Sequence, residues 1–414
     1  MADGSSLQCC VAGGGPAGLM LGYLLARAGV RVAVLEKHAD FLRDFRGDTV
    51  HPSTLEIMVE LGLIDAFLKL PHQRVERLGG VVGETPVAIA DFRHLPVRER
   101  YIAMMPQWDF LNFLASEAQR FPGFALHMST EATDLVLEDG AVVGVVARGP
   151  ADEQRIRADL VVAADGRNSI LREKAGLAVQ DLGAPMDALW FRIPAEPGDS
   201  GETMGRFGAG NILVMLFRGD YWQCAYVIPK GSLATLKAAG LDAFRDVVAA
   251  ASTLDRKRMA ALASWDDVKL LTVRVDRLLA WHRAGFLCIG DAAHAMSPIG
   301  GVGVNLAVQD AVAAANILGE PLRDGRVTSA DLAAVQKRRM FPTRVTQAIQ
   351  VAAQNAIIGP TLKLREQPKP PLALKLMQWF PILQRLPARV LGLGVRREHV
   401  ARFIRERHGQ PPVS

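Results

Sequence analysis

A glycine-rich turn near the N-terminus restricts the fold of this chain more than any other feature. It reads Gly13-Gly-Gly15-Pro-Ala-Gly18 and overlaps the end of a short apolar run at residues 9–14. Residues 19–28 have the apolar spacing of a helix, and residues 30–35 form a second apolar run that leads to Glu36. This order predicts a β-α-β unit of an open α/β sheet, made of a strand, a tight glycine turn, a helix and a second strand that ends at an acid.

The spacing of these residues also predicts a ligand. Gly13 permits the tight turn, Gly15 lets the backbone approach a pyrophosphate, and Gly18 lets the helix pack closely on the strand. Glu36, 23 residues after Gly13, is placed to accept hydrogen bonds from a ribose. We therefore predict a dinucleotide site, which the loop alone does not assign to FAD or to NAD.

A second glycine-rich stretch, at residues 290–305, is also typical of a ligand site. An apolar run at residues 285–289 leads into Asp291, then into a turn with Pro298 and three glycines, and then into a long helical pattern. In this order the acid and the free amides of a helix N-terminus face the same point. Such amides favour the binding of an anionic or carbonyl oxygen of a ligand. The alternative is an ordinary glycine turn.

Composition excludes several classes of protein. The net charge of +5 is mild and the basic residues are scattered until the C-terminal region, so we expect no nucleic-acid partner. The four cysteines lack metal-ligand spacing, so we predict no metal and buried thiols in the reducing cytoplasm. We find no signal-peptide pattern and no apolar run of about 18 residues.

A chain of 414 residues is long enough for two or three domains, and the fold class predicted is α/β. We expect a Rossmann-like cofactor domain made of three segments, residues 1–75, 104–178 and 275–345. Residues 76–103 and 179–270 are rich in strand patterns and predict an inserted β-sheet substrate domain. Residues 346–414 predict a helical C-terminal region.

Three motifs in this order give the chain a family resemblance. They are Gly13-x-Gly15-x-x-Gly18, Asp165-Gly-Arg-Asn-Ser-Ile-Leu-Arg172, and Gly290-Asp291-Ala-Ala-His294 with Pro298. Together they resemble the class A flavoprotein monooxygenases, the para-hydroxybenzoate hydroxylase family, over residues 7–345. The resemblance implies a Rossmann-like FAD-binding domain of the GR2 type and FAD as the cofactor.

The resemblance also implies roles for individual residues. It places Arg46 near the flavin and pyrophosphate, Gln107 near the ribityl chain, Ala132 near the adenine and Asp291 at the ribityl or phosphate region. The full implied cofactor set is Gly13, Gly14, Gly15, Pro16, Ala17, Gly18, Glu36, Lys37, Arg46, Gln107, Ala132, Asp165, Asp291, Pro298, Gly301, Gly303, Val304 and Asn305.

The stretch from Gly301 to Asn305 would offer backbone N–H groups to the flavin pyrimidine ring, which is anionic when reduced. We expect the Asp165-Gly166 motif, helped by Ser169 and Arg172, to serve both FAD and the nicotinamide donor. For His294 we favour a local packing or hydrogen-bonding role over catalysis, so no side chain is assigned as the catalyst.

The reaction implied by the resemblance uses NADH or NADPH to reduce FAD. O2 then adds at flavin C4a, and the hydroperoxide hydroxylates an aromatic or other electron-rich apolar substrate. The candidate substrate residues come from alternating strand patterns, which any half-buried strand also shows. They are Trp190, Arg192, Met204, Phe207, Met215, Phe217, Trp222, Cys224 and Tyr226.

Other functions remain open at this level. The main alternative is an FAD-dependent reductase or dehydrogenase of a hydrophobic substrate, and a flavin-bound sensor is a third. A flavin-dependent halogenase is disfavoured, because both tryptophans of the Trp-x-Trp-x-Ile-Pro signature are missing at residues 224–229.

The C-terminal region also has two interpretations. Residues 370–386 are apolar and basic, which is compatible with contact with a membrane surface. We favour packing on the core or on a second subunit, because Pro381 and Pro387 interrupt any long amphipathic helix. The sequence leaves a monomer and a homodimer both open.

Overall fold

The computed structural model describes residues 7–42, 49–199 and 203–406. Its centre is an eight-stranded sheet in which β1 is parallel to the strands on both sides, β11 and β2. The spatial order along the main path is β19 (His282–Arg283), β20 (Phe286–Cys288), β11 (Glu153–Ala163), β1 (Leu7–Ala12), β2 (Val32–Leu35) and β8 (Phe124–His127). Strands β1, β2 and β20 are buried along their whole length, as expected of a parallel sheet covered on both faces.

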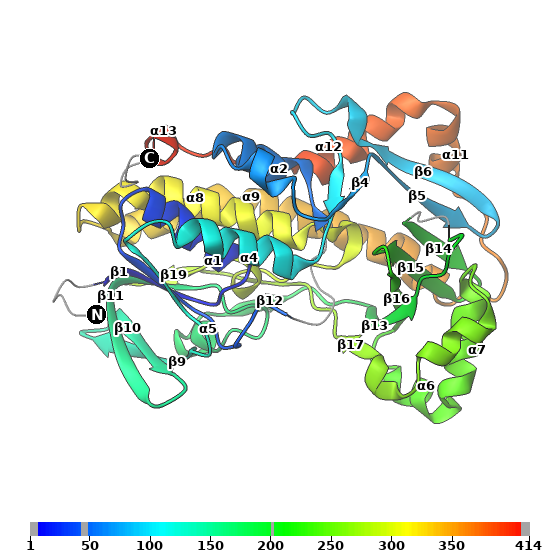
Figure 1. The fold of residues 1–414 in the computed structure, drawn as a ribbon, viewed down its shortest axis with the longest axis horizontal. Helices are drawn as coiled ribbons and strands as arrows, with labels where there is room; N and C mark the ends of the chain where they lie inside the picture. The colour runs from blue at the N-terminus through cyan, green and yellow to red at the C-terminus, as the bar shows by residue number, and fades with distance from the viewer. Residues whose placement is uncertain (1–6, 43–48, 200–202, 407–414) are drawn as a thin grey trace.

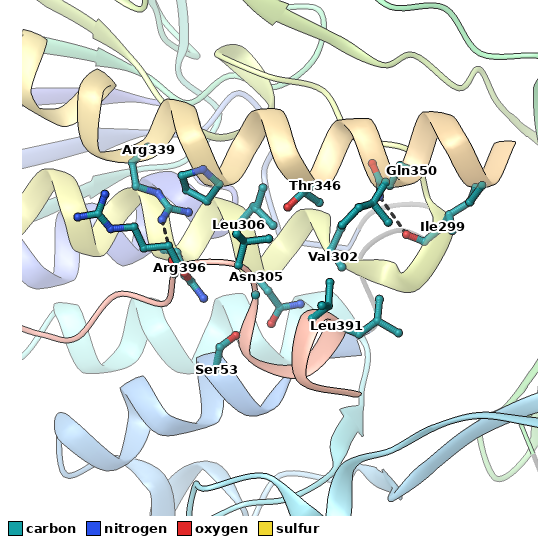
Figure 2. Close-up of a pocket in the computed structure, with 17 residues that line it drawn as sticks. Ser53, Ile299, Val302, Asn305, Leu306, Arg339, Thr346, Gln350, Leu391 and Arg396 are labelled. Carbon is teal, nitrogen blue, oxygen red and sulfur yellow. Dashed lines mark hydrogen bonds between the residues drawn. The ribbon is translucent and has the colours of Figure 1, made fainter. Parts of the chain in front are cut away.

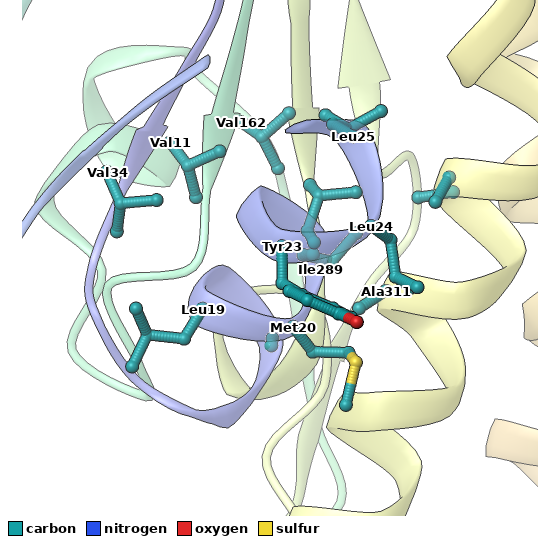
Figure 3. Packing of buried hydrophobic residues seen from close by; sticks show 14 of the residues in the cluster. Val11, Leu19, Met20, Tyr23, Leu24, Leu25, Val34, Val162, Ile289 and Ala311 are labelled. Atoms are coloured by element: carbon teal, nitrogen blue, oxygen red, sulfur yellow. The ribbon is translucent and has the colours of Figure 1, made fainter. Parts of the chain in front are cut away.

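Helices cover this sheet, as Figure 1 shows. Helix α1 (Pro16–Arg27) packs on the strands, and α4 (Gln107–Ala118) and α8 (Gly303–Arg323) pack against α1. Figure 3 shows the apolar core between them, with Leu24 of α1 near Ala311 of α8. The stretch Ile299–Arg323 is long and apolar enough to cross a membrane, but 78% of its apolar window is buried, so its apolar surface packs inside the fold.

The second large sheet of the structure has seven strands. Its order is β17 (Lys269–Leu271), β13 (Met186–Pro194), β16 (Tyr221–Pro229), β15 (Asn211–Phe217), β14 (Met204–Gly208), β5 (Arg77–Val82) and β6 (Thr85–Asp91). The parallel pairing of Gly205 with Gly80 joins the two inserted segments in one sheet. One face carries α6 (Leu233–Ala239), α7 (Leu241–Ala251) and the 3-10 helix η2 (Arg256–Ala261).

Smaller elements connect the two sheets. Strands β3 (Thr49–Val50), β7 (Ile102–Met104) and β4 (Gln73–Val75) form one small sheet, and β12 (Val179–Asp181) pairs with β18 (Asp276–Leu278). The remaining elements near the site are α2 (Pro52–Glu60), α3 (Ile64–Phe67) and α5 (Ile170–Lys174). The C-terminal part contains α9 (Ser329–Ala353), α11 (Leu372–Trp379), η7 (Pro381–Gln384), α12 (Arg385–Leu393) and α13 (Arg402–Arg405).

The α/β fold class is confirmed, and the structure contains a tight hairpin at Asp139-Gly140. These two residues join β9 (Glu131–Glu138) to β10 (Ala141–Arg148) with φ values of 48° and 79°, the left-handed pair of a tight hairpin turn. Two details differ. Helix α1 begins three residues before the predicted start, because proline is well accommodated in a first helical turn. The predicted boundary at 345/346 falls inside the continuous helix α9.

Candidate cofactor site

The N-terminal turn has the geometry that its glycines predict. Gly13 has a φ of 106°, and a β-carbon there would lie 2.4 Å from the carbonyl oxygen of Ala164. A β-carbon on Gly18 would lie 1.9 Å from the carbonyl oxygen of Gly13. Gly15 is different, because no described atom lies within 4 Å of its β-carbon position. This open side at the N-terminus of α1 fits a phosphate group on free helix amides.

Glu36 holds the opposite side of this turn. Its side chain is 2% exposed, and its Oε2 accepts a hydrogen bond of 2.9 Å from the Gly14 amide. Its Oε1 accepts a second bond, of 3.0 Å, from the His38 amide. A carboxylate oxygen can accept more than one hydrogen bond, so the same group fits ribose hydroxyls. The neighbouring Lys37 is exposed.

Asp165 follows β11 and lies beside the first turn. Its Oδ2 is 3.4 Å from the Leu171 amide, while its buried Oδ1 has no hydrogen-bond partner among the described residues. Burial raises the pKa of this carboxyl above its ordinary value. A buried acceptor without a partner is costly unless a ligand hydroxyl or amide reaches it, so Asp165 fits a place in the cofactor site.

The two later motifs meet in space. The Arg167 guanidinium lies 3.1 Å from Oδ2 of Asp291, and both side chains are partly buried. Arg172 donates to the carbonyl oxygens of Arg167 and Ala292, at 2.7 Å and 3.4 Å. Its amide is capped by the Ser169 hydroxyl at 3.1 Å. These contacts connect the Asp165 segment to the Gly290 segment. Ser169 and Arg172 therefore stabilise the contact between the two segments.

The loop before α8 is strained in a way that only glycine tolerates. Gly300 and Gly301 have φ values of 77° and 62°. A β-carbon on Gly301 would lie 2.4 Å from Oγ1 of Thr49, which itself donates to the Gly301 carbonyl at 2.7 Å. Helix α8 then begins at Gly303, where nothing in the described chain lies within 4 Å of the β-carbon position. Its first-turn amides are therefore available to a ligand.

Helix α9 fixes the other side of this loop. The Gln350 side chain donates to the carbonyl oxygens of Ser297 and Ile299, at 2.9 Å and 3.0 Å, and accepts from the Ser297 amide at 3.1 Å. Figure 2 shows Gln350 reaching Ile299 beside a cavity of about 70 Å³. Pro298, between these two contacts, is exposed.

Asn305 links the loop to the segment that follows β3. Its Oδ1 accepts from the His51 amide at 2.8 Å and from the Thr54 hydroxyl at 2.7 Å. Its Nδ2 donates to the carbonyl oxygens of Thr49 and Gly301, at 3.2 Å and 3.4 Å. The polar atoms of the Asn305 side chain are thus hydrogen-bonded within the protein. Only the backbone of this residue is left to bind the cofactor.

Thr49, His51 and Thr54 were not among the residues predicted from the sequence. The available signal was a short run of polar residues before α2, directly after Arg46. Arg46 itself lies outside the described residues.

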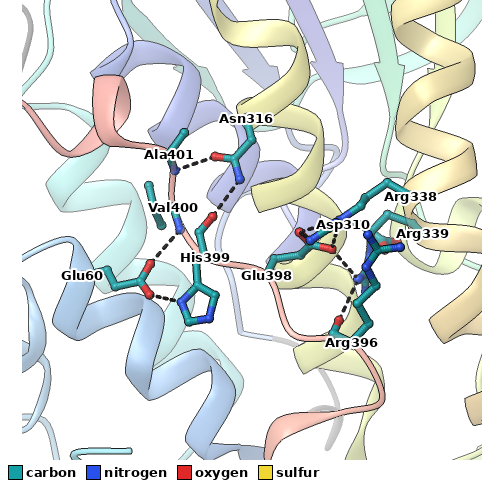
Figure 4. Close-up of polar contacts among 10 residues, drawn as sticks. All are labelled: Glu60, Asp310, Asn316, Arg338, Arg339, Arg396, Glu398, His399, Val400 and Ala401. Atoms are coloured by element: carbon teal, nitrogen blue, oxygen red, sulfur yellow. Dashed lines mark hydrogen bonds and ion pairs between the residues drawn. The ribbon is translucent and has the colours of Figure 1, made fainter.

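His294 makes a local hydrogen bond, as the sequence favoured. It is buried, and its Nε2 lies 2.5 Å from Oδ2 of Asp310. Arg339 donates to the other Asp310 oxygen at 2.8 Å and pairs with Glu398 at 3.0 Å. Figure 4 shows Asp310 beside Arg339 and Glu398. Burial alone would raise the pKa of the Asp310 carboxyl, but its contacts with His294 and Arg339 hold this pKa below its ordinary value. The geometry gives His294 an anchoring contact.

Two other predicted cofactor residues lie at element boundaries. Gln107 is the first residue of α4, and Ala132 is the second residue of β9; both are half-buried. Val304 is buried in the first turn of α8.

The predicted substrate residues are divided between the two faces of the seven-stranded sheet. Because side chains alternate along a strand, each strand contributes to two faces. One face packs on α7 and η2, away from the cofactor loop, and it includes five predicted residues. They are Met215, Phe217, Trp222, Cys224 and Tyr226. Trp222 also donates to Asp199 at 2.7 Å. These residues form an ordinary core.

The opposite face of the seven-stranded sheet faces the part of the protein that contains the candidate cofactor site. Phe207 packs in a cluster with Ile299 of the α8 loop, and Trp190 packs with Val214, Leu216 and Met104. The buried Nε1 of Trp190 has no acceptor in the described structure. Arg192 is exposed and stacks 4.6 Å above Tyr221, and Met204 is described by its backbone alone. Trp190 and Phe207 thus remain candidates for a substrate wall.

Comparisons with known proteins agree with this geometry. A family model described as FAD binding domain matches residues 6–349. The chain is 33% identical to the 6-methylpretetramide 4-monooxygenase of Streptomyces rimosus over 86% of both chains. It is 31% identical to the rifampicin monooxygenase of Streptomyces venezuelae, over 73% of this chain and 61% of that protein.

A solved structure shares the fold. The anhydrotetracycline hydroxylase OxyS of Streptomyces rimosus superimposes with a TM-score of 0.72 at 23% identity, over 95% of this chain and 77% of that one. The family match covers most of the chain, and the relatives favour the oxygenase over the reductase alternative. This chain therefore belongs to the FAD binding domain family, as a class A FAD-dependent monooxygenase.

Proposed function

We propose that this enzyme uses NADH or NADPH and O2 to hydroxylate an apolar, multi-ring aromatic compound of the polyketide type. The observation that carries the proposal is the 33% identity to 6-methylpretetramide 4-monooxygenase over 86% of both chains. The apolar sheet face around Trp190 and Phe207 supports it, because ring systems are bound mainly by apolar walls with few polar contacts.

The proposed cofactor position follows the three motifs. The ADP half lies along the turn from Gly13 to Gly18, with Glu36 on the ribose and the free Asp165 Oδ1 as an acceptor nearby. The loop from Pro298 to Asn305 would hold the flavin ring, and Asp291 would contact the region between the two halves. FAD, when bound there, would carry electrons from the nicotinamide donor to O2 and pass one oxygen atom of that O2 to the substrate.

The protein then contributes orientation and electrostatics. The first-turn amides of α8, which begins at Gly303, would stabilise negative charge on the flavin pyrimidine ring, because amides fixed in a helix need no reorganisation. The sheet face holds the aromatic substrate against the ring and excludes water. The unpartnered Trp190 Nε1 is placed to donate to a substrate carbonyl or phenol oxygen.

The nicotinamide donor and the compartment are further parts of the proposal. The chain carries one glycine fingerprint of the dinucleotide type, so the donor enters a shared cleft rather than a domain of its own. Cys9, Cys10, Cys224 and Cys288 are all buried and unpaired, which supports a reducing, cytoplasmic location.

The test measures NADH and NADPH oxidation by the purified yellow protein with a panel of phenols, quinolones and multi-ring polyketides. The proposal predicts that a multi-ring compound stimulates oxidation and yields a product heavier by one oxygen atom. Stimulation with hydrogen peroxide as the sole product identifies that compound as an effector. No stimulation by any ring compound, together with anaerobic reduction of a hydrophobic substrate, would overturn the proposal.

A further inference from the structure

A cluster of large apolar side chains lies exposed on the C-terminal helices. Six residues between 372 and 386 expose 45–70% of their surface, and we call them the C-terminal apolar patch: Leu372, Trp379, Phe380, Ile382, Leu383 and Leu386. The sequence favoured packing of this segment on the core or on a second subunit, and within the single chain these six side chains do not pack on the core. Several large apolar side chains exposed within one short segment are a feature of interaction sites on folded proteins.

The patch is presented by anchored helices. Ala388 and Leu393 of α12 are buried against Ala90 and Phe92, so the opposite side of α12 is fastened to the sheet. Gln378 donates to the Ala88 carbonyl at 3.1 Å, which fastens α11 to β6. Figure 1 shows α11 at the outer edge of the molecule near β6, and α12 between α11 and α2. The outward side chains therefore form a fixed surface.

The segment that carries the patch is also rich in positive charge. Residues 363–397 contain eight basic residues and one acidic residue, Glu366. The basic residues are Lys363, Arg365, Lys369, Lys375, Arg385, Arg389, Arg396 and Arg397. Within the described chain none of these eight forms an ion pair. Their charge is thus available to an external partner.

We propose that the C-terminal apolar patch docks the enzyme on an anionic lipid surface. Aromatic and aliphatic side chains that insert at the headgroup level, with lysines and arginines beside them, are the features of peripheral membrane contact. A second copy of the chain fits less well. A two-fold contact sets the same basic segment against its own copy, which brings like charges together at the interface.

The patch also lies close to the proposed substrate wall. Ala388 and Leu393, on the inner side of α12, belong to the same apolar cluster as Trp190 and Val214. Docking by the outer side would therefore bring this wall near the lipid phase, where an apolar aromatic compound concentrates. The docking proposal itself rests on the patch and its charges and is independent of the substrate.

The experiment is sedimentation of the FAD-loaded enzyme with phosphatidylcholine vesicles, with and without phosphatidylglycerol. We expect binding to the anionic vesicles that weakens with salt. The double variant Trp379→Glu/Ile382→Glu should lose binding by roughly tenfold or more. The triple variant Lys375→Gln/Arg385→Gln/Arg389→Gln should lose it by roughly 100-fold.

The matched control is Leu279→Glu, because Leu279 is 61% exposed but lies next to β18, outside the patch. This variant should bind vesicles as the parent does. The proposal is overturned if the parent enzyme does not bind anionic vesicles, or if the double variant binds equally well. It is also overturned if the parent does not bind vesicles but is a dimer in analytical ultracentrifugation, while the double variant is a monomer.

Discussion

Arg167 and Asp291, 124 residues apart, pair across 3.1 Å and join the end of β11 to the end of β20. The two strands are neighbours in the central sheet, so their carboxyl ends open on one edge. In open α/β sheets that edge is where ligands bind. The pair thus lies between the two glycine turns that we propose hold the ends of FAD.

Asp291→Ala should lower FAD affinity. Hydrogen bonds to a charged group contribute roughly 1.5 to 3 kcal/mol, so we expect a loss of about 10- to 100-fold. Titration of the apoprotein with FAD, followed by flavin fluorescence, measures this. Asp134→Ala is the matched control, since Asp134 also pairs with a cation, Lys174, but on an exposed strand. Equal FAD affinities in the two variants would show that Asp291 is not part of the cofactor site.

Gly301→Ala should disturb the loop before α8. The new methyl group would have to occupy a left-handed backbone position and lie 2.4 Å from the Thr49 hydroxyl oxygen. We expect a cost of about 1 to 3 kcal/mol in unfolding free energy and a shifted flavin absorption spectrum. Gly149→Ala is the control, because its nearest described contact is 3.6 Å away. An unchanged spectrum in Gly301→Ala would separate this loop from the flavin ring.

His51 should make stability depend on pH. Burial lowers its pKa from 6.5 to about 4, despite the opposing hydrogen bond to the Leu391 carbonyl. The unfolded chain therefore binds a proton at a higher pH than the folded chain, so stability present above pH 6.5 is lost as the pH falls toward 4.

We expect this group to contribute a loss of about 3 kcal/mol over that range. Urea unfolding of the parent and of His51→Gln at several pH values measures it. The His51→Gln variant should show a flatter profile, whereas His38→Gln, at an exposed position, should keep the parent slope. Parallel profiles for all three proteins would contradict the assignment.

The two faces of the seven-stranded sheet should respond differently to substitution. Trp190→Phe keeps most of the apolar surface and removes one buried N–H, so we expect a higher KM for the aromatic substrate with a near-parental melting temperature. Met215→Ala, on the face toward α7, should cost about 2 to 5 kcal/mol of stability with little change in KM. A KM change in Met215→Ala alone would reverse our assignment of the faces.

These contrasts also show which features the sequence could predict. Gly13, Gly18 and Glu36 were predictable because their roles depend on local backbone geometry within one β-α-β unit. The contacts of Asn305 with His51 and Thr54 were not, since they join segments about 250 residues apart in the chain. Such pairings follow from the topology of the whole fold.

The choice of sheet face was unpredictable for another reason. An alternating pattern separates an apolar face from a polar one, but here both faces are covered. Helix α7 packs on Phe191 and Met215, and the cofactor half packs on Trp190 and Val214. Strands with apolar residues on both faces give no local signal for the side that meets the substrate.

The central claim is that this chain transfers one oxygen atom from O2 to an aromatic ring. The direct measurement is turnover of the FAD-loaded enzyme with a stimulating ring compound and a nicotinamide donor under ¹⁸O2, followed by mass spectrometry. We predict a product that carries a single ¹⁸O atom, with no label when ¹⁸O is supplied as water. A product that has gained two hydrogens and no oxygen would contradict the account and identify a reductase.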